Sequence, residues 1–438
     1  MLDSFPPSLI ELIHRNPIVA NTMSSSVQPF QISIPDSEIR DLHERLAKAR
    51  FPDELDSAEW DLGAPLADVQ RLTKFWRDKF DWRRAETVLN RLPHFTTTIQ
   101  CEGYESLRIH FLHRKSGVKG AIPLLFVHGW PGSFLEATKI IDALTSPPNS
   151  SSSSKTDEQF AFDIVAPSLP NFGFSEGTKK RGFSIEQHAE TLHKLMLQLG
   201  YEQYATQGGD WGYYITRAIS LLYPGHCKAT HFNMDVGAKP TFLKNPLLAL
   251  EDAIRPLSAR EKQGIARTEW FDNEGFGYNL LQSTKPQTLG YGLTDSPVAL
   301  LAWIYEKLHD WTDAYPWTDD EVCTWVSVYW FSTAGPAASC RIYYEMGRSG
   351  PWGNRLTRDK VREWQSGVKI GISHFPRDIH VLPSTWTRTV GNCVFEKEHD
   401  AGGHFAAWER PMDLVDDLRE MFGRGGGAYG VVEGRDGF

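Results

Sequence analysis

The chain has 438 residues, a hydrophobic fraction of 41% and a formal net charge of −9. This length allows two or three domains and a core large enough to hold a catalytic cleft. The acidic balance argues against nucleic acid or a strongly bound membrane surface as a partner, because both attract basic patches. Five scattered cysteines without metal-ligand spacing fit a reducing, cytoplasmic compartment without a disulfide framework.

The first 94 residues predict a helical arm that precedes the main fold. The apolar stretch within residues 1–22 is too short and too broken for the core of a signal peptide, and no apolar run is long enough for a membrane span, so we expect residues 1–27 to be an N-terminal extension. An amphipathic helix is predicted over residues 36–51, with Asp36 as its cap. A second, aromatic-rich helix is predicted from Leu66 to Phe80. We expect residues 28–94 to pack on the main fold as an arm.

Strand and helix signals alternate over residues 95–235. Two β-rich runs flank a turn-like stretch and predict a hairpin at 96–99 and 107–111. Short apolar runs separated by helical stretches follow at 123–127, 162–166 and 204–207. Such alternation is typical of a largely parallel sheet that helices cover on both faces. We expect a surface loop where five consecutive serines stand, within 147–156.

The alternation stops at residue 236, and the chain to residue 345 is helical and rich in tryptophan. Strand signals return at 368–372 and 394–396, so residues 346–422 are expected to complete the sheet. A helical insertion within a sheet fold is typical of a lid domain. The glycine-rich segment 423–438 predicts a flexible tail. The predicted class is therefore α/β, with a mostly parallel central sheet, a helical lid insertion and an N-terminal helical arm.

The segment Gly208-Gly209-Asp210-Trp211-Gly212 follows a predicted strand and begins a predicted helix. Small residues two positions to either side of Asp210 fit a sharp turn that pushes the central side chain outward as a nucleophile. A carboxylate nucleophile forms an alkyl ester from saturated carbon, which indicates an epoxide or an alkyl halide as the substrate. The alternative is a glycine-rich turn in which Asp210 only caps a helix.

A second glycine-rich loop, His128-Gly129-Trp130-Pro131-Gly132-Ser133, follows another predicted strand. In folds with a nucleophile on such a turn, one N–H of this loop and the N–H after the nucleophile hold an oxyanion. The two donors here would be the backbone N–H groups of Trp130 and Trp211. The alternative is an ordinary strand–helix turn.

The candidate base is His404, which follows the last predicted strand, and Asp378 follows the strand before it. A nucleophile, an acid and a histidine in this chain order match the order expected for such folds. Asp378 could orient the imidazole and stabilise its protonated form. Either residue alone would more often be structural, since the chain has 15 histidines and 55 acidic residues.

These motifs together resemble the microsomal-type epoxide hydrolases, most closely their soluble fungal members, over roughly residues 28–422. The loop at 128–131 fits the family's HGxP motif, in which the Trp-Pro bond tends to be cis. The segment at 402–407 fits the base position, and Asp378 stands where fungal members have Asp and mammalian members have Glu. The resemblance implies an α/β-hydrolase fold. Because no convincing N-terminal anchor is present, we follow the soluble type.

The resemblance also assigns two lid tyrosines that the sequence alone would not single out. The segments Gly277-Tyr278 and Arg341-Ile342-Tyr343-Tyr344 resemble those that carry the family's proton donors to the epoxide oxygen. This likeness implies that role for Tyr278 and Tyr343. Tyr344 departs from the family pattern and complicates the second assignment.

The reaction implied is hydrolysis of an apolar epoxide to a vicinal diol through an ester on Asp210, which water activated by His404 and Asp378 then cleaves. No metal or organic cofactor is expected. Two alternatives remain at this point: a haloalkane dehalogenase, which shares the Asp and His but not two lid phenols, and an inactive hydrolase that serves as a small-molecule receptor. The physiological substrate, a detoxifying or biosynthetic role, and a homodimer through the arm or lid stay open.

Overall fold

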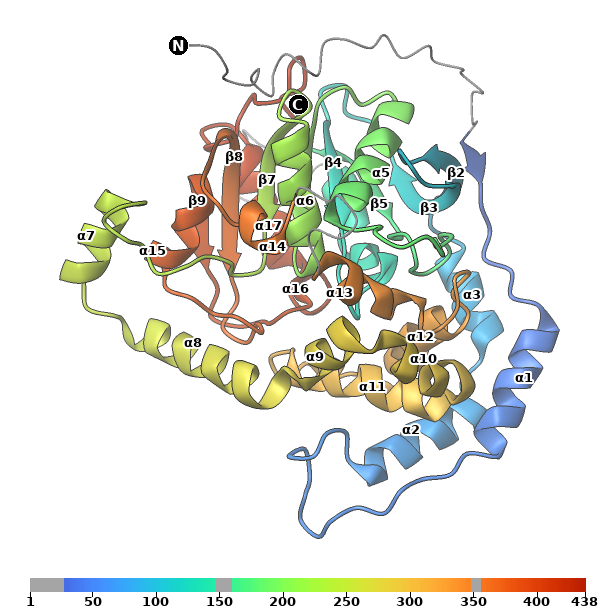
Figure 1. Ribbon diagram of the computed structural model, residues 1–438. Helices are drawn as coiled ribbons and strands as arrows, with labels where there is room; N and C mark the ends of the chain where they lie inside the picture. Colours follow the sequence, from blue (N-terminus) through green and yellow to red (C-terminus); the bar gives the residue numbers. More distant parts are fainter. Residues whose placement is uncertain (1–26, 147–159, 348–355) are drawn as a thin grey trace, which may run out of the picture.

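The computed structural model describes residues 27–146, 160–347 and 356–438. Within these residues a nine-stranded sheet runs in the order β1-β2-β3-β5-β4-β6-β7-β8-β9 (Figure 1). The predicted extension up to residue 26 and the predicted serine-rich loop lie outside the described residues. The strands are β1 Gln28–Pro29, β2 His94–Gln100, β3 Ser106–Arg114, β4 Ile122–Val127, β5 Phe162–Pro167, β6 Tyr204–Gly208, β7 Cys227–Phe232, β8 Gln365–His374 and β9 Gly391–Glu398.

The sheet is antiparallel from β1 to β5 and parallel from β5 through β4 to β9. The predicted hairpin and the mostly parallel α/β sheet are therefore confirmed. Strand β7 was not predicted, because Thr230 and His231 make it look polar. Both side chains are buried, where Thr206 donates to Thr230 at 2.9 Å and His231 contacts the hydroxyl of Ser373 at 2.9 Å.

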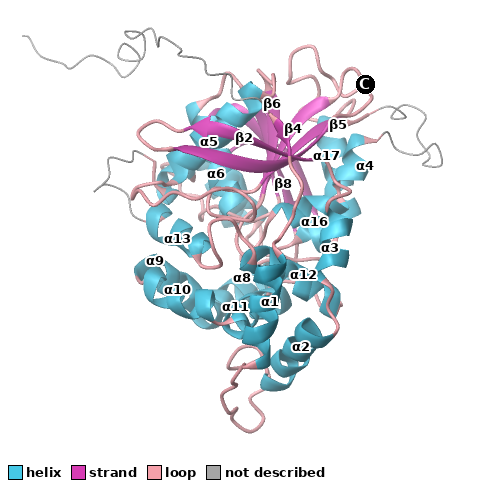
Figure 2. Ribbon diagram, turned by 90° about the vertical axis from the view of Figure 1, so that its right-hand side faces the viewer, coloured by secondary structure: helices cyan, strands magenta, loops and turns pink. Residues whose placement is uncertain are grey.

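Helices cover both faces of the sheet, with α5 and α6 on one side and α4 and α17 on the other (Figure 2). Residues 236–345 contain no strand, as the lid prediction requires. None of the helices in the described ranges is long and apolar enough to cross a bilayer. The α-helices are α1 Asp36–Ala47, α2 Leu66–Asp78, α3 Trp82–Leu89, α4 Ile141–Thr145, α5 Ile185–Gln198, α6 Trp211–Leu222, α7 Pro246–Ile254, α8 Ala259–Trp270, α9 Gly277–Thr284, α10 Pro286–Asp295, α11 Pro297–Asp310, α12 Asp319–Trp330, α13 Arg341–Met346, α14 Arg358–Val361, α15 Ser384–Thr387, α16 Ala406–Glu409 and α17 Pro411–Phe422. Shorter turns are η1 Phe134–Lys139, η2 Phe271–Gly275, η3 Ala338–Cys340 and η4 Arg388–Val390.

The N-terminal arm packs chiefly on the lid. Helix α2 contacts α11 and α12, and the indole N–H of Trp76 donates to the hydroxyl of Ser327 on α12 at 3.0 Å (Figure 1). The capping prediction at the start of the arm was wrong. Pro35 is the N-cap of α1, and Asp36 lies in its first turn without a side-chain cap bond. Its carboxylate instead pairs with Arg83 of α3.

The expectation of a flexible tail after Gly423 was also wrong. The segment returns to the start of the parallel strands, where the N–H of Gly437 donates to the carbonyl of Gly120 at 2.8 Å. Arg435 pairs with Asp163 at 3.1 Å. The tail's glycines were misleading because several of them allow close backbone contact. A Cβ on Gly427, for example, would lie 2.3 Å from the carbonyl oxygen of Val394.

Candidate active site

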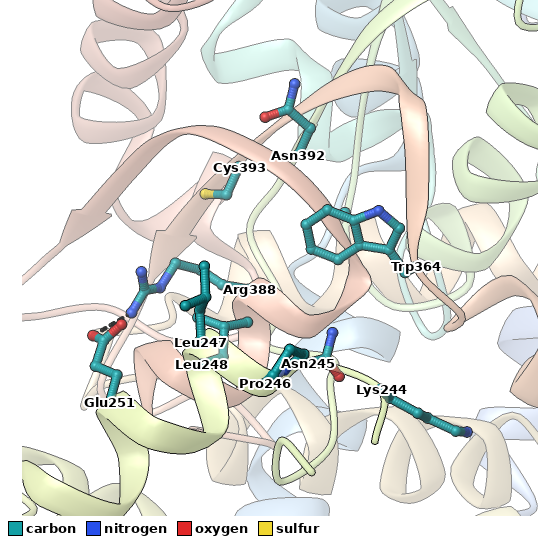
Figure 3. Close-up of a pocket in the computed structure, with 11 residues that line it drawn as sticks. Lys244, Asn245, Pro246, Leu247, Leu248, Glu251, Trp364, Arg388, Asn392 and Cys393 are labelled. Atoms are coloured by element: carbon teal, nitrogen blue, oxygen red, sulfur yellow. Dashed lines mark hydrogen bonds and ion pairs between the residues drawn. The ribbon is translucent and has the colours of Figure 1, made fainter. Parts of the chain in front are cut away.

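Two cavities differ in the chemistry they offer. The larger, of about 520 Å³, lies between α7 and β9 (Figure 3), where Arg388 donates to Glu251 at 2.5 Å. Its one thiol, Cys393, is unreactive because burial raises its pKa to about 12. The smaller cavity, of about 370 Å³, contains Asp210 and both predicted lid tyrosines. We therefore take the smaller cavity as the candidate active site.

Asp210 occupies a strained turn between β6 and α6. Its φ is 50°, in the left-handed region that few residues other than glycine adopt. The flanking glycines are needed for close packing. A Cβ on Gly212 would lie 1.9 Å from the carbonyl oxygen of Val127, and one on Gly208 would lie 2.7 Å from the backbone of Gly212. This geometry is that of a nucleophile elbow, which presents the central side chain to the cavity.

The loop after β4 supplies a backbone donor to this carboxylate. The N–H of Trp130 donates to Oδ1 of Asp210 at 2.7 Å. Trp211 is the first residue of α6, so its N–H has no acceptor within the helix. Gly129 leaves room for this approach, because a Cβ there would lie 2.3 Å from Oδ1. The two predicted oxyanion donors thus stand on either side of the predicted nucleophile.

The same loop is fixed from the lid side. The Trp130–Pro131 bond is cis, as the family resemblance implied. On α12, the indole N–H of Trp325 donates to the carbonyl of Pro131 at 2.6 Å, and the hydroxyl of Tyr329 donates to the carbonyl of Gly132 at 2.6 Å. These bonds couple the position of the oxyanion loop to the lid.

His404 and Asp378 meet beyond the ends of β9 and β8. Nδ1 of His404 lies 2.6 Å from Oδ1 of Asp378, and both side chains are buried. Backbone bonds fix the two loops: the N–H of Ile379 donates to Oδ1 of Asp378 at 2.6 Å, and the N–H of Arg377 donates to the carbonyl of Gly402 at 3.0 Å. The imidazole is thereby held with Nε2 facing Asp210.

Nε2 of His404 lies 3.5 Å from Oδ2 of Asp210, so Asp210, His404 and Asp378 form a continuous series of polar contacts. Burial on its own lowers the pKa of His404. The carboxylates of Asp378 and Asp210 outweigh it and raise the pKa to about 10. The two carboxylates therefore favour the protonated form of the imidazole that lies between them.

Tyr278 and Tyr343 project into the cavity from α9 and α13. The two rings lie 5.7 Å apart and nearly perpendicular, and Tyr278 stacks on Trp130 at 5.3 Å. Burial raises the pKa of both phenols well above the ordinary value of 10, so both stay protonated. Among the described residues, the buried Tyr343 hydroxyl makes no hydrogen bond of good geometry, and Trp211 and Tyr278 are its polar neighbours. Tyr344 does not compete, because its hydroxyl accepts from Arg181 outside the cavity at 3.3 Å.

A buried acid that sequence reasoning missed lies next to the oxyanion loop. Glu136 of η1 is 9% exposed, and a Cβ on Gly132 would lie 1.8 Å from its Oε1. Burial raises the pKa of Glu136 to about 8, with a further increase from the charge of Asp210 and an opposing effect of His404. A glutamate in an ordinary turn gives no sequence signal for this proximity.

Other cavity residues also escaped prediction. Four are apolar and form its wall, and two are arginines: Met234, Phe271, Phe276, Ile379, Arg358 and Arg362. Their positions depend on how the lid and the loop after α14 fold over the sheet, which no local pattern reveals. Within the described ranges, no cluster of histidine, cysteine, aspartate or glutamate side chains is arranged to hold a metal.

Comparison with known proteins gives two family matches that together span the arm, the oxyanion loop and the elbow. Residues 27–137 match the epoxide hydrolase N terminus, and residues 122–269 match the alpha/beta hydrolase fold. A putative epoxide hydrolase of Stigmatella aurantiaca is 38% identical over 402 residues, which cover 90% of this chain and 84% of that protein. Epoxide hydrolase 1 of Sus scrofa is 35% identical, with coverage of 91% and 89%.

Solved structures give the same likeness. The epoxide hydrolase of Aspergillus niger superposes with a TM-score of 0.75 at 33% identity, covering 90% of this chain and 95% of that one. The juvenile hormone epoxide hydrolase of Bombyx mori superposes with a TM-score of 0.77 at 30% identity, covering 90% and 93%. The likeness extends over the arm, the sheet and the lid together.

Proposed function

The chain belongs to the epoxide hydrolases of the α/β-hydrolase fold, and on this premise we propose that it opens its substrate through a covalent ester on Asp210. The observation that carries the proposal is the position of the Asp210 carboxylate. One oxygen accepts from the N–H of Trp130, and the other faces His404 at 3.5 Å. Membership in this family also argues against the dehalogenase and receptor alternatives.

In the first half-reaction the hydroxyls of Tyr278 and Tyr343 hold the epoxide oxygen. Oδ2 of Asp210 attacks one ring carbon from the opposite side, because Oδ1 is occupied by the N–H of Trp130. The new C–O bond forms as the ring C–O bond breaks, and a phenol proton passes to the leaving alkoxide. The raised pKa of both phenols keeps that proton in place until the alkoxide develops.

Ester formation prepares the second half-reaction. Alkylation neutralises Asp210, which is one of the two carboxylates that raise the pKa of His404. The pKa of His404 then falls, and His404 releases its proton to solvent. Neutral His404 can then take a proton from water. The hydroxide attacks the ester carbonyl of Asp210, and the N–H groups of Trp130 and Trp211 stabilise the oxyanion. The acyl C–O bond then breaks, and the proton of the added hydroxyl passes to the leaving alkoxide, so that the Asp210 carboxylate and the diol are released. The phenolate takes from solvent a proton equivalent to the one that His404 had released.

The wall of the cavity suggests the body of the substrate. Met234, Phe271, Phe276 and Ile379 offer apolar surface beside the two phenols. Such surface favours epoxides with an aryl or alkyl body, because burial of apolar area contributes about 25 cal/mol per Å². We therefore propose an epoxide with an apolar body as the substrate.

A trapped intermediate tests the mechanism. We expect His404→Gln, mixed with styrene oxide, to gain the mass of one styrene oxide on the peptide that contains Asp210, since alkylation needs no base. The double variant Asp210→Ala/His404→Gln is the matched control and should gain no mass. Steady diol production by His404→Gln at the wild-type rate, without a mass gain, would contradict the proposal.

A further inference from the structure

The catalytic cavity contains two arginines beside its apolar wall. Arg358 begins α14 and Arg362 follows its end, and both line the same cavity as Asp210 and the lid tyrosines. An apolar epoxide has no anionic group that could pair with either guanidinium. The two arginines therefore indicate a charged group on the ligand that hydrolysis of the ring does not require.

Arg362 is held in place by the helix that carries the nucleophile. One of its terminal nitrogens donates to the hydroxyl of Tyr214 on α6, and its guanidinium lies 5.3 Å from the centre of the Tyr214 ring. On the same helix, the buried Arg217 donates to the carbonyl of Val361 at 3.0 Å and to the carbonyl of Glu363 at 2.9 Å. The backbone around Arg362 is thus anchored to α6.

Neither cavity arginine forms a close ion pair among the described residues. Arg362 has the hydroxyl of Tyr214 as its hydrogen-bond partner, and its Nε is buried without an acceptor. Of the other acidic residues in the cavity, Asp272 faces His380 at 3.5 Å, and Asp359 is exposed and acts on Arg362 only through its charge. Burial lowers the pKa of Arg362, but Tyr214 and Asp359 outweigh burial, so the guanidinium stays charged and can bind an anion in the cavity.

The two arginines lie a short distance from the reacting atoms. The Arg358 guanidinium is 5.8 Å from the centre of the Trp211 ring, and that ring is 4.9 Å from the ring of Tyr343. The Trp211 ring therefore lies beside both the Arg358 guanidinium and the Tyr343 ring and links the arginine end of the cavity to the phenols. A planar carboxylate matches the fork of a guanidinium donor best.

We infer that the cavity takes epoxides that carry a carboxylate at the end remote from the ring, with that carboxylate bound by Arg358 and Arg362. This inference rests on the proposed function and specifies its substrate class. The apolar wall contacts the body of the substrate, and the phenols bind the oxygen of the epoxide ring. The arginines fix the distance between that ring and the carboxylate of the substrate.

A series of terminal epoxy-alkanoates with six to twelve carbons, each compared with its methyl ester, tests the inference. We expect kcat/KM to favour the acid over the ester by about 10-fold or more at one chain length. Arg362→Gln and Arg358→Gln should each reduce this ratio by about 10-fold, and Arg362→Lys should reduce it less, because it retains the charge. Arg91→Gln changes an exposed arginine in the arm and should leave the ratio unchanged.

Several outcomes would overturn the inference: esters preferred at every length, or an acid preference that Arg358→Gln and Arg362→Gln do not reduce. Hydrolysis of neither acids, esters nor styrene oxide would instead contradict the proposed function. Calorimetric binding of 4-phenylbutyrate against 4-phenylbutyramide needs no turnover and no arginine variant. We expect the acid to bind wild type at least about 10-fold more tightly, and equal affinity would overturn the inference by itself.

Discussion

The sheet edge and the lid supply opposite kinds of chemistry to one cavity. Loops at the ends of β6, β8 and β9 present Asp210, Asp378 and His404, whose charges are coupled at 2.6 and 3.5 Å. The lid presents Tyr278 and Tyr343, whose burial keeps them neutral. This difference would let one site hold the proposed nucleophile and the proposed acid: charge is concentrated where backbone donors fix it, and protons are retained where burial among aromatic rings raises the pKa of the phenols.

The largest effect should come from the sheet edge. Asp210→Ala removes the atom to which the substrate binds covalently, so both half-reactions fail. We expect kcat on styrene oxide to fall at least about 10⁵-fold, measured by diol formation under saturating substrate. Circular dichroism of the variant controls for folding, and retention of more than a small fraction of wild-type kcat would separate Asp210 from the chemistry.

Asp378→Asn should affect the second half-reaction more than the first. The variant removes one carboxylate that raises the pKa of His404 and leaves the imidazole poorly oriented. We expect ester hydrolysis to slow by about 10³-fold, and its rise with pH to move to lower pH because the pKa of His404 falls. Rapid-quench measurement of both half-reactions checks this, and an unshifted pH profile would limit Asp378 to a packing role.

The lid phenols should show a smaller effect confined to the first half-reaction. Tyr278→Phe or Tyr343→Phe leaves one donor to the epoxide oxygen, and we expect alkylation to slow by about 10²-fold for either. The double variant should lose considerably more. Tyr344→Phe, whose hydroxyl faces Arg181 outside the cavity, is the matched control and should alkylate at the wild-type rate. Equal slowing of ester hydrolysis would contradict the assignment.

The smallest expected effect concerns stability and the missed acid. The pKa of Glu136 is raised by burial from 4.5 to about 8, so the wild type loses stability as the pH rises between these values, where only the unfolded chain ionises. Glu136→Gln has no such loss. The Tm of Glu136→Gln minus that of the wild type should therefore be about 5 °C larger at pH 8 than at pH 4. A difference that does not depend on pH would mean that Glu136 titrates normally.

The sequence predicts the sheet edge better than the lid. A nucleophile elbow needs small residues at fixed spacing, and Gly208, Gly212 and Gly129 mark close approaches that leave a local pattern. Strand order alone then brings the loops carrying Asp378 and His404 together at the ends of β8 and β9. The positions of the proposed nucleophile, Asp378 and His404 therefore follow from the short glycine pattern of the turn and from the order of the strands.

The lid and its neighbours follow no such local rule. Tyr278 and Tyr343 were identified only through family resemblance, because a tyrosine that projects into a cavity has the same sequence context as one in a core. Glu136 and Arg362 were missed because their burial depends on segments far apart in the chain. The glycine-rich tail was mispredicted for the same reason, since only the folded sheet shows what Gly427 and Gly437 pack against.

A single turnover in ¹⁸O-labelled water, with enzyme in excess over styrene oxide, tests the covalent ester most directly. A covalent ester predicts an unlabelled first diol, because the oxygen added to the ring comes from Asp210, and label in the peptide that contains Asp210. Label in the first diol, with none in that peptide, would show that water attacks the epoxide directly and would contradict the ester on Asp210.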